Sequence, residues 1–536
     1  MTAERAEGLS RRGALGWALA LAAGGLIPRM AQAEGEAAAG AGAGEQAAAA
    51  AANGLQFGEA QPFSAATVED MARALAAAPY AAPPEISADW QGLTYDETRE
   101  IWYDGARALF GETDSPVRAE MFAASLYQKT PVAVHAVQDG MAREVIFALD
   151  LFVRTDRFPA LPETGTGFAG FRLTGQVETP GVFQEYAVWQ GATYFRAVGR
   201  GQQYGLSARG LALRTASGKG PEEFPLFRSF WIEQAEKHAT FATVHALMDS
   251  PSVTGAYRFT VSPGDATVMD VEAVLFPRVD LDEVGIAPET SMYLFSDLNR
   301  LRFDDFREAV HDSDGLLIAS GSGATMWRPL MNPQGVETSW FADTAPRGFG
   351  LMQRARDPLA YNDLAAHYER RPSLWVEPKG DWGEGAVVLV EIPADKEIYD
   401  NVVAFWRPKA PLVAGQEHRF GYRLWWAAGA PPVDGEVAPV IATRTGERVF
   451  EEGRLFSVDY GAHPALGQDP ADLEARVTTS AGEVRGAQVF ANPGTGGVQV
   501  AATLVLPADQ PSELRIELWR GGRTLVGEVW LYRWMP

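Results

Sequence analysis

Two short acidic segments of the chain carry the residue types that acid–base chemistry needs. The first is AVHDSDGLLI, which places His311, Asp312, Ser313 and Asp314 in a row between apolar residues. Two interpretations are open. Asp, Ser and Gly favour turns, so the segment is typical of a hairpin turn between two strands. The apolar flanks instead draw it toward the protein interior, where a carboxylate needs a partner or a raised pKa.

The second segment is EIPADKEIYDNVVAFWRP (391–408), in which Glu397 and Asp400 lie just before the apolar run VVAFW. A solvated loop is the simplest interpretation. Two separated carboxylates that face one cleft are also what glycoside hydrolysis requires, since one protonates the leaving oxygen while the other activates water or attacks carbon. The sequence alone does not bring Asp312 and Asp400 together.

The elements that must position these acids are predominantly strands. From about Ile101 the chain shows short β-branched and aromatic runs such as REVIFALDLFV, YRFTVSPG and AVVLVEI, separated by Gly, Pro, Asn and Asp. This rhythm predicts a mainly β fold with a large N-terminal antiparallel β-sandwich. After the linker-like PKAPLVAGQE (408–417), about seven further strands predict a smaller C-terminal immunoglobulin-like β-sandwich.

Helical patterns are few. FSAATVEDMARALAAAPY (63–80) predicts a helix with Ser64 as N-cap, and YNDLAAHYERR (361–371) is the best of the other helical segments. We predict four regions: a signal peptide (1–33), a low-complexity Ala/Gly tether (34–54), a large β-sandwich that contains both acidic segments and the binding or catalytic site (55–410), and an immunoglobulin-like domain (411–536).

Composition excludes several classes of function. The net charge of −23 argues against binding to nucleic acid or to an anionic membrane, which requires a basic surface. The chain has no cysteine, which excludes thiolate catalysis and Cys-ligated metals, and its seven histidines are scattered. GTGFAG (165–170) matches a dinucleotide fingerprint, but a strand-like run follows it where a helix is required. We therefore expect no metal and no cofactor.

The N-terminus predicts export. Arg11 and Arg12 precede an apolar run from Gly13 to Ile27, and Ala31-Gln32-Ala33 has the small-x-small form of a cleavage site. The run is shorter than the ~20 residues that span a bilayer. We predict a signal peptide of the twin-arginine type and a periplasmic protein that is not inserted in the membrane once the signal is removed.

Several longer segments identify a family resemblance. They include GATYFRAVGRGQQYGLSARGLALRTA (191–216), VHDSDGL (310–316), RGFGLMQR (347–354), RPSLWVEPKGDWGEGAVVLVEIP (371–393) and DNVVAFWRP (400–408). Together they resemble the periplasmic glucan biosynthesis proteins G and D, from about Phe63 to the C-terminus. The twin-arginine signal is more similar to the D branch. The resemblance implies a role in making osmoregulated periplasmic glucans, which have a β-1,2-glucose backbone.

The resemblance also implies roles for single residues. Asp400 corresponds to the general acid of an anomer-inverting glucanase and Asp312 to a general base that acts on water through a relay, while Tyr368 and Glu397 correspond to supporting residues. Tyr399 departs from the Asn that usually precedes the acid. Residues of the motifs that are candidates for substrate binding, as aromatic platforms or as hydrogen-bond donors to sugar hydroxyls, are Tyr194, Arg196, Trp327, Arg347 and Trp382.

Two functions remain in competition. The first is an enzyme, a glucanase or transglycosylase that trims or remodels β-1,2-glucan. The second is a non-catalytic protein that binds glucan as it leaves an inner-membrane glucan synthase, with the C-terminal domain suited to contact with that partner. The Asp312 and Asp400 pair favours the first function, and Tyr399 leaves the second open.

Overall fold

The computed structural model describes residues 54–429, 431 and 437–536. The predicted signal peptide (1–33) and all but the last residue of the predicted tether (34–54) lie outside these ranges. Within them the chain divides into two compact units. Unit 1 contains the residues up to Val284 together with 411–424, and unit 2 contains 285–410 together with 425–536. The domain boundary at 410/411 stays a prediction.

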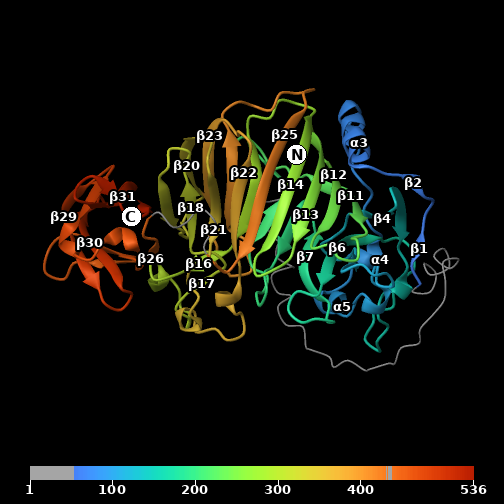
Figure 1. Ribbon diagram of the computed structural model, residues 1–536, viewed down its shortest axis with the longest axis horizontal. Coiled ribbons are helices and arrows are strands. Elements are labelled where there is room, and N and C mark those ends of the chain that lie inside the picture. Colours follow the sequence, from blue (N-terminus) through green and yellow to red (C-terminus); the bar gives the residue numbers. More distant parts are fainter. Residues whose placement is uncertain (1–53, 430, 432–436) are drawn as a thin grey trace, which may run out of the picture. The chain divides into compact units, whose positions relative to one another are not determined.

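Unit 1 is built from two sheets (Figure 1). In the first, parallel pairing joins β4 to β11, antiparallel pairing joins the other neighbours as far as β14, and β25 pairs with β14. The members, in spatial order, are β5 (Met141–Ile146), β4 (Ala133–Gln138), β11 (Leu226–Glu233), β12 (Ala242–Asp249), β13 (Val253–Ser262), β14 (Thr267–Pro277) and β25 (His418–Ala427). Two short strands, β1 (Gln56–Phe57) and β2 (Gln61–Pro62), pair with β5.

The second sheet of unit 1 is antiparallel throughout. Its order is β3 (Val117–Ala123), β6 (Phe168–Gly175), β7 (Gln184–Gln190), β8 (Tyr194–Ala197) and β9 (Ser207–Arg209), and β10 (Leu211–Leu213) follows in the chain. Aromatic contacts join the two sheets: the ring centroids of Phe171 and Phe230 lie 5.1 Å apart, and those of Trp189 and Phe259 lie 5.5 Å apart. These contacts make unit 1 a sandwich.

The helix predicted after Ser64 is confirmed as α3 (Ala65–Ala77). It buries Val68 and Ala72 against Trp231 and Leu247 of the first sheet. Two shorter helices, α4 (Ala88–Gln91) and α5 (Tyr95–Arg99), follow it. Among the described residues, no helix has the length and the apolar character that crossing a membrane requires.

The N-terminal part of unit 2 also consists of antiparallel sheets. One has the order β20 (Glu337–Thr344), β23 (Glu384–Glu391), β24 (Val402–Pro408), β15 (Val284–Ser291), and the other β19 (Thr325–Pro329), β18 (Gly315–Ala319), β21 (Gly348–Met352), β22 (Ser373–Lys379). A small ribbon pairs β16 (Tyr293–Phe295) with β17 (Val310–His311). Buried polar contacts join the two larger sheets; Glu391 Oε2 on β23 accepts a hydrogen bond from Arg328 on β19 at 3.0 Å.

The C-terminal part of unit 2 forms a second sandwich, which confirms the predicted mainly β, immunoglobulin-like ending. One sheet has the order β26 (Val440–Glu447), β27 (Arg454–Tyr460), β30 (Gly497–Val505), β29 (Glu483–Asn492), and the other joins β28 (Leu473–Thr479), β31 (Ser512–Arg520), β33 (Val529–Trp534) and the short β32 (Thr524–Leu525). FGYRLWWA, expected as the first strand here, is β25 and pairs instead with β14.

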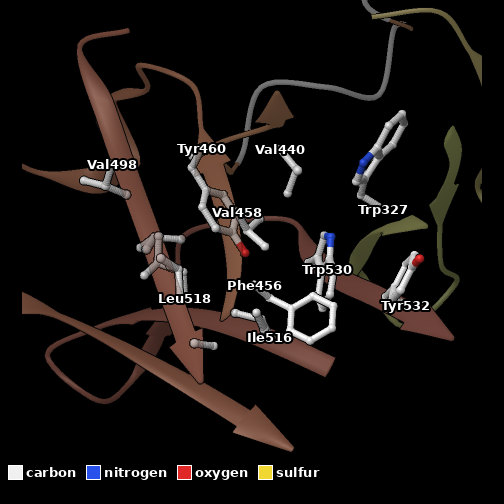
Figure 2. Packing of buried hydrophobic residues seen from close by; sticks show 14 of the residues in the cluster. Trp327, Val440, Phe456, Val458, Tyr460, Val498, Ile516, Leu518, Trp530 and Tyr532 are labelled. Carbon is white, nitrogen blue, oxygen red and sulfur yellow. The ribbon is translucent and has the colours of Figure 1, made fainter. Parts of the chain in front are cut away.

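A single apolar core fills the C-terminal sandwich (Figure 2). Phe456, Val458 and Tyr460 alternate along β27 and are completely buried, as expected where one face of a strand is covered. Trp327 enters this core from β19, whose backbone pairs in parallel with β33 at Trp530. The C-terminal sandwich is therefore attached to the rest of unit 2 through its core.

One predicted helix is wrong. Residues 361–371 form no α-helix but turns and one 3₁₀ segment, η5 (Tyr368–Arg370). Another, η4 (Pro358–Ala360), directly precedes them. Asn362 and His367 both have left-handed backbone angles, with φ of 54° and 48°. The Asp363 carboxylate accepts hydrogen bonds from the backbone N–H groups of Ala365 and Ala366. Such local side-chain bonds compete with helix formation, and here they prevail.

Candidate active site

Both acidic segments lie in unit 2, and in each of them the acid next to a strand is buried. His311 ends β17, and β18 begins at Gly315. These strands pair with different partners, so the residues between them cross from one sheet to another and do not close a hairpin. Asp312 and Asp400 are each only 2% exposed, although charged carboxylates are rarely buried without partners.

A single strand segment separates the two acids. The backbone N–H of Asp312 donates to the carbonyl of Met292 at 2.8 Å. On the opposite side, the Asn401 side chain accepts from the N–H of Tyr293 at 2.8 Å and donates to its carbonyl at 2.9 Å. Neighbouring residues of a strand direct their backbone groups to opposite edges, so the Met292–Tyr293 segment lies between the backbone of Asp312 and the Asn401 side chain that follows Asp400.

Asn401 is a positioning residue that the sequence reasoning did not single out. Its side chain is 1% exposed and also donates to the carbonyl of Ile392 at 2.9 Å. The Ile392 N–H in turn donates to the Asn401 carbonyl at 2.8 Å. These bonds fix the chain directly after Asp400. The only hint in the sequence is its place beside the acid in the motif DNVVAFW.

Asp312 is held by an arginine from the misassigned helical segment. Arg371 Nη1 donates to Asp312 Oδ1, and both side chains are largely buried. The Arg371 guanidinium also lies over the Tyr368 ring, 4.2 Å from its centroid. Burial lowers the pKa of Arg371, but its contact with the Asp312 carboxyl group raises it more, so this pKa lies above its ordinary value.

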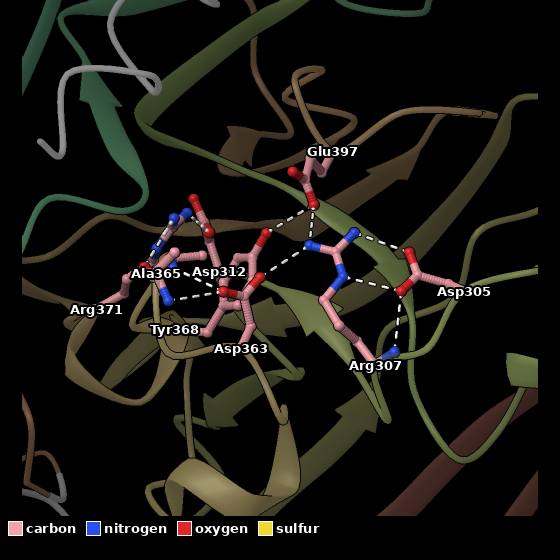
Figure 3. A network of polar contacts seen from close by, with 9 residues as sticks. Asp305, Arg307, Asp312, Asp363, Ala365, Tyr368, Arg371 and Glu397 are labelled. Atoms are coloured by element: carbon pink, nitrogen blue, oxygen red, sulfur yellow. Dashed lines mark hydrogen bonds and ion pairs between the residues drawn. The ribbon is translucent and has the colours of Figure 1, made fainter.

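Tyr368 connects this pair to Glu397 (Figure 3). The Tyr368 hydroxyl donates to Glu397 Oε2 at 3.0 Å, while its ring is 2% exposed. Burial raises the pKa of the Tyr368 phenol well above its ordinary value, and the Arg371 charge opposes that rise. The phenol is therefore a hydrogen-bond donor at neutral pH, which suits a carboxylate acceptor.

Arg307 gathers three carboxylates around one guanidinium (Figure 3). Its Nη1 donates to Glu397 and lies 3.1 Å from Asp363, and its Nη2 lies 2.8 Å from Asp305. The hydrogen bond from Arg307 lowers the pKa of Asp305. Burial alone raises the pKa of Asp363. Hydrogen bonds from backbone N–H groups of the segment and from Arg307 outweigh this effect, so the pKa lies below its ordinary value. No sequence pattern marks Arg307.

The rest of the His311–Asp314 segment has anchoring contacts. Burial lowers the pKa of His311, which stacks on Tyr293 and exchanges hydrogen bonds with the Gln353 side chain at 2.8 Å. Asp314 Oδ2 accepts from the backbone N–H of Arg354 at 2.9 Å. The Arg354 guanidinium in turn binds Glu528 of the C-terminal sandwich at 2.6 Å. The segment carrying Asp312 is thus fixed from two directions.

The structure brings together Asp312, Tyr368 and Glu397, and Asp400 follows Glu397 by three residues. The five residues predicted to bind substrate have other contacts. Tyr194 and Arg196 lie on β8 of unit 1, Trp327 lies in the apolar core, Arg347 donates to the carbonyls of Ser320 and Gly323, and Trp382 is buried beside Trp406. A sugar-binding role for the five stays a prediction.

Among the described residues, no group of three or more His, Asp or Glu side chains is placed to hold a metal ion. The candidate site consists of carboxylates held by arginines and a phenol, together with the Asn401 amide that fixes the chain after Asp400.

Comparison with known proteins identifies the family. The family described as "Periplasmic glucan biosynthesis protein, MdoG" matches residues 63–534. The chain belongs to this family. Glucans biosynthesis protein G of Bradyrhizobium diazoefficiens is 42% identical over 529 residues, which cover 98% of this chain and 100% of the relative. Its counterpart in Shewanella sp. (strain ANA-3) is 44% identical over 489 residues, covering 90% and 88%.

Membership in the periplasmic glucan biosynthesis family confirms the resemblance found in the sequence. It gives the chain a role in periplasmic glucan biosynthesis and implies a periplasmic location. The relatives carry the name of the G protein, whereas the twin-arginine signal had pointed to the D branch. Export by the twin-arginine route stays a prediction.

Proposed function

We propose that this protein acts on the β-1,2-glucan backbone as an anomer-inverting glucanase or transglycosylase. Asp400 is the general acid, which gives its proton to the glycosidic oxygen as the bond to the anomeric carbon breaks. Asp312 is the general base, which receives the proton of the attacking water through a relay. In transfer, a sugar hydroxyl takes the place of that water.

The observation that supports this proposal is that two buried acids, Asp312 and Asp400, belong to chain segments that bond to opposite sides of the Met292–Tyr293 strand segment. Inverting glycosidases place one carboxyl group on each side of the bond that is cleaved, so that a water fits between base and sugar. The Arg371 guanidinium, which donates to Asp312, holds that carboxyl group in place.

Tyr368 and Glu397 have supporting roles in this proposal. Glu397 receives hydrogen bonds from Tyr368 and Arg307, which fix the loop that ends at Asp400. Tyr399 lies inside that loop, between the fixed Glu397 and the buried acid. Its larger side chain, where relatives of the motif have Asn, alters the space beside the acid and so bears on which sugar or relay group is accepted.

The test uses the mature protein and linear β-1,2-glucan. We expect shorter glucan products whose new reducing ends are first released with inverted configuration, observed by NMR. Asp400→Asn and Asp312→Asn should each lower the rate about 10²- to 10⁴-fold, the usual contribution of a general acid or base. Asp395→Asn is the matched control, because this exposed acid lies in the same loop. Full activity in Asp400→Asn contradicts the proposal.

A second candidate is a non-catalytic glucan-binding protein that works with an inner-membrane glucan synthase. The observation that favours it is the ion pair of Asp312 with Arg371, which already satisfies the proposed base. The same experiment separates the two candidates. Glucan binding without turnover, equal in the parent protein and in Asp400→Asn, supports the binding function.

A further inference from the structure

Glu528 is a buried carboxyl group of the C-terminal sandwich that the proposed mechanism does not use. It directly precedes β33 and is 1% exposed. Its Oε1 accepts a hydrogen bond from Nη2 of Arg354 at 2.6 Å, and its Oε2 accepts one from Nη1 at 2.7 Å. Oε2 also accepts from the backbone N–H of Val440 at 2.8 Å. Two parallel bonds of this kind fix the direction of a guanidinium as well as its place.

Arg354 joins the C-terminal sandwich to the segment that carries Asp312. Its guanidinium lies 3.8 Å from the centre of the Trp327 ring and donates to the Val440 carbonyl at 2.6 Å. Both of these residues belong to the apolar core of the C-terminal sandwich (Figure 2). The backbone N–H of Arg354 donates to Asp314 Oδ2 at 2.9 Å. One residue thus binds the C-terminal sandwich with its side chain and the acidic segment with its backbone.

Gln353 extends this connection to Tyr368. Its side chain is 1% exposed and donates to the carbonyl of His311 at 2.8 Å and to that of Tyr368 at 3.2 Å. His311 directly precedes Asp312 in the chain. The two residues that follow β21 therefore bind the C-terminal sandwich, the segment of Asp312 and the segment of Tyr368 at once.

Stability alone is a weak reason for a salt bridge at this depth. The side chains of Glu528 and Arg354 are 1% and 15% exposed. Apolar residues of similar volume often stabilise such a junction as well or better, because charged groups lose their water when they are buried. Apolar residues do not supply a fixed direction, whereas the paired bonds do. The salt bridge is therefore suited to holding the chain at Arg354 in one place.

We propose that Glu528 is a positioning residue, through which the C-terminal sandwich holds the segments of Asp312 and Tyr368 in place at the site. The catalytic part of this inference rests on the proposed function. A displacement of about 1 Å, even one caused far from the chemistry, can lower a rate about 10²-fold. The C-terminal sandwich is then part of the catalytic unit, and not only a surface suited to a partner.

The kinetic test compares the full mature wild type with Glu528→Gln, which keeps the shape of the side chain but turns one acceptor of Arg354 into a donor. We expect kcat on linear β-1,2-glucan to fall about tenfold while KM changes by less than about twofold, because the substrate contacts remain. Asp249→Asn is the matched control. The Asp249 side chain in unit 1 is equally buried, at 1%, and binds Arg228 at 2.7 Å and Arg278 at 2.9 Å. Its kcat should equal that of the wild type.

Hydrogen–deuterium exchange measures the positioning without any reaction. In Glu528→Gln the backbone N–H groups of residues 310–314 and 366–371 should exchange at least about tenfold faster than in the wild type, because a hydrogen bond to a charged group is lost. In Asp249→Asn the exchange of these two segments should not change.

Each result decides the inference. Unchanged exchange of the two segments in a folded Glu528→Gln protein overturns it, and so does an equal kcat in Glu528→Gln and Asp249→Asn. A wild type that cleaves no glucan refutes the proposed function, and exchange alone then decides whether Glu528 positions the two segments. If Glu528→Gln does not fold, Arg354→Lys replaces it, because lysine keeps a positive charge beside Glu528 but loses the paired bonds. Its kcat should fall about threefold to tenfold.

Discussion

The apolar core of the C-terminal sandwich and the polar network around Glu397 are both parts of unit 2, but they are stabilised in opposite ways (Figures 2 and 3). In the core, many side chains from regular strands share the stabilisation through contact with one another. In the network, a few charged groups from loops depend on a small number of specific partners. Substitutions in the core should therefore mainly lower the free energy of unfolding. Substitutions in the network should lower activity more than their small effect on the free energy of unfolding suggests.

The largest effect on stability is expected from the core. Phe456 is completely buried, and its ring centroid lies 5.9 Å from Trp530 and 6.0 Å from Tyr532. Phe456→Ala should lower the free energy of unfolding by about 3–5 kcal/mol. Denaturant unfolding followed by tryptophan fluorescence measures this loss. Below the transition, glucan cleavage per folded molecule should be retained.

The control for this prediction is Phe450→Ala, because Phe450 is 96% exposed. Its free energy of unfolding should change by no more than about 0.5 kcal/mol. A loss below about 1 kcal/mol in Phe456→Ala would mean that the core relaxes around the cavity. The contrast between the two regions would then be weaker than the burial indicates.

The two regions also differ in how far the sequence predicts them. The alternation of Phe456, Val458 and Tyr460 is a local pattern, of the kind that indicates a strand with one buried face. The helix α3 was predicted from Ser64 and its apolar spacing. That prediction succeeds because its pattern is local and repeats.

The network has no such pattern. Arg371 pairs with an acid 59 residues away, and Arg307 pairs with Glu397, 90 residues away. Charge partners at this separation are selected by the folded backbone, so neither arginine could be found from spacing. The same contacts explain the failure at 361–371, where Asp363 bonds to Arg307 and to its own backbone in place of a helix. The burial of Asp312, in contrast, was indicated by its apolar neighbours.

The next largest effect is expected at Asn401, whose side chain bonds to the Met292–Tyr293 strand segment. Asn401→Ala leaves the backbone groups of Tyr293 and the Ile392 carbonyl without this partner. We expect a loss of about 2–3 kcal/mol in unfolding free energy, because buried polar groups become unsatisfied. Cleavage per folded molecule should fall much further than in Phe456→Ala. Equal cleavage in the two variants would show that Asn401 does not position Asp400.

Arg307→Gln should have a smaller effect that depends on pH. The bond from Arg307 lowers the pKa of Asp305 in the folded state below its ordinary value near 4. A lowered carboxylate pKa stabilises the fold above the unfolded pKa, and this contribution is lost as the pH falls through the folded pKa. We expect the variant to lose about 1–3 kcal/mol at pH 7 and much less near pH 3.

Unfolding free energies of wild type and variant at several pH values test this sign. Arg300→Gln is the control, because its pair with Glu308 at 3.2 Å is much more exposed. Its effect should stay within about 1 kcal/mol. A difference between wild type and Arg307→Gln that grows toward acid pH would contradict the role assigned to Arg307.

The smallest effect on stability is expected from Tyr368→Phe, and its control makes it the sharpest test of the network. The variant loses the 3.0 Å bond to Glu397 but keeps the ring beneath Arg371. Tyr361→Phe is the matched control, because its buried hydroxyl donates to the Ala355 carbonyl, also at 3.0 Å. Each variant should lose about 0.5–1.5 kcal/mol of stability. Only Tyr368→Phe should lower kcat, by about threefold to tenfold with little change in KM, because only its hydroxyl reaches the loop that carries Asp400. An equal kcat in the two variants would mean that the Tyr368 bond supports the fold as Tyr361 does, and that the network stabilises the loop without tuning the acid.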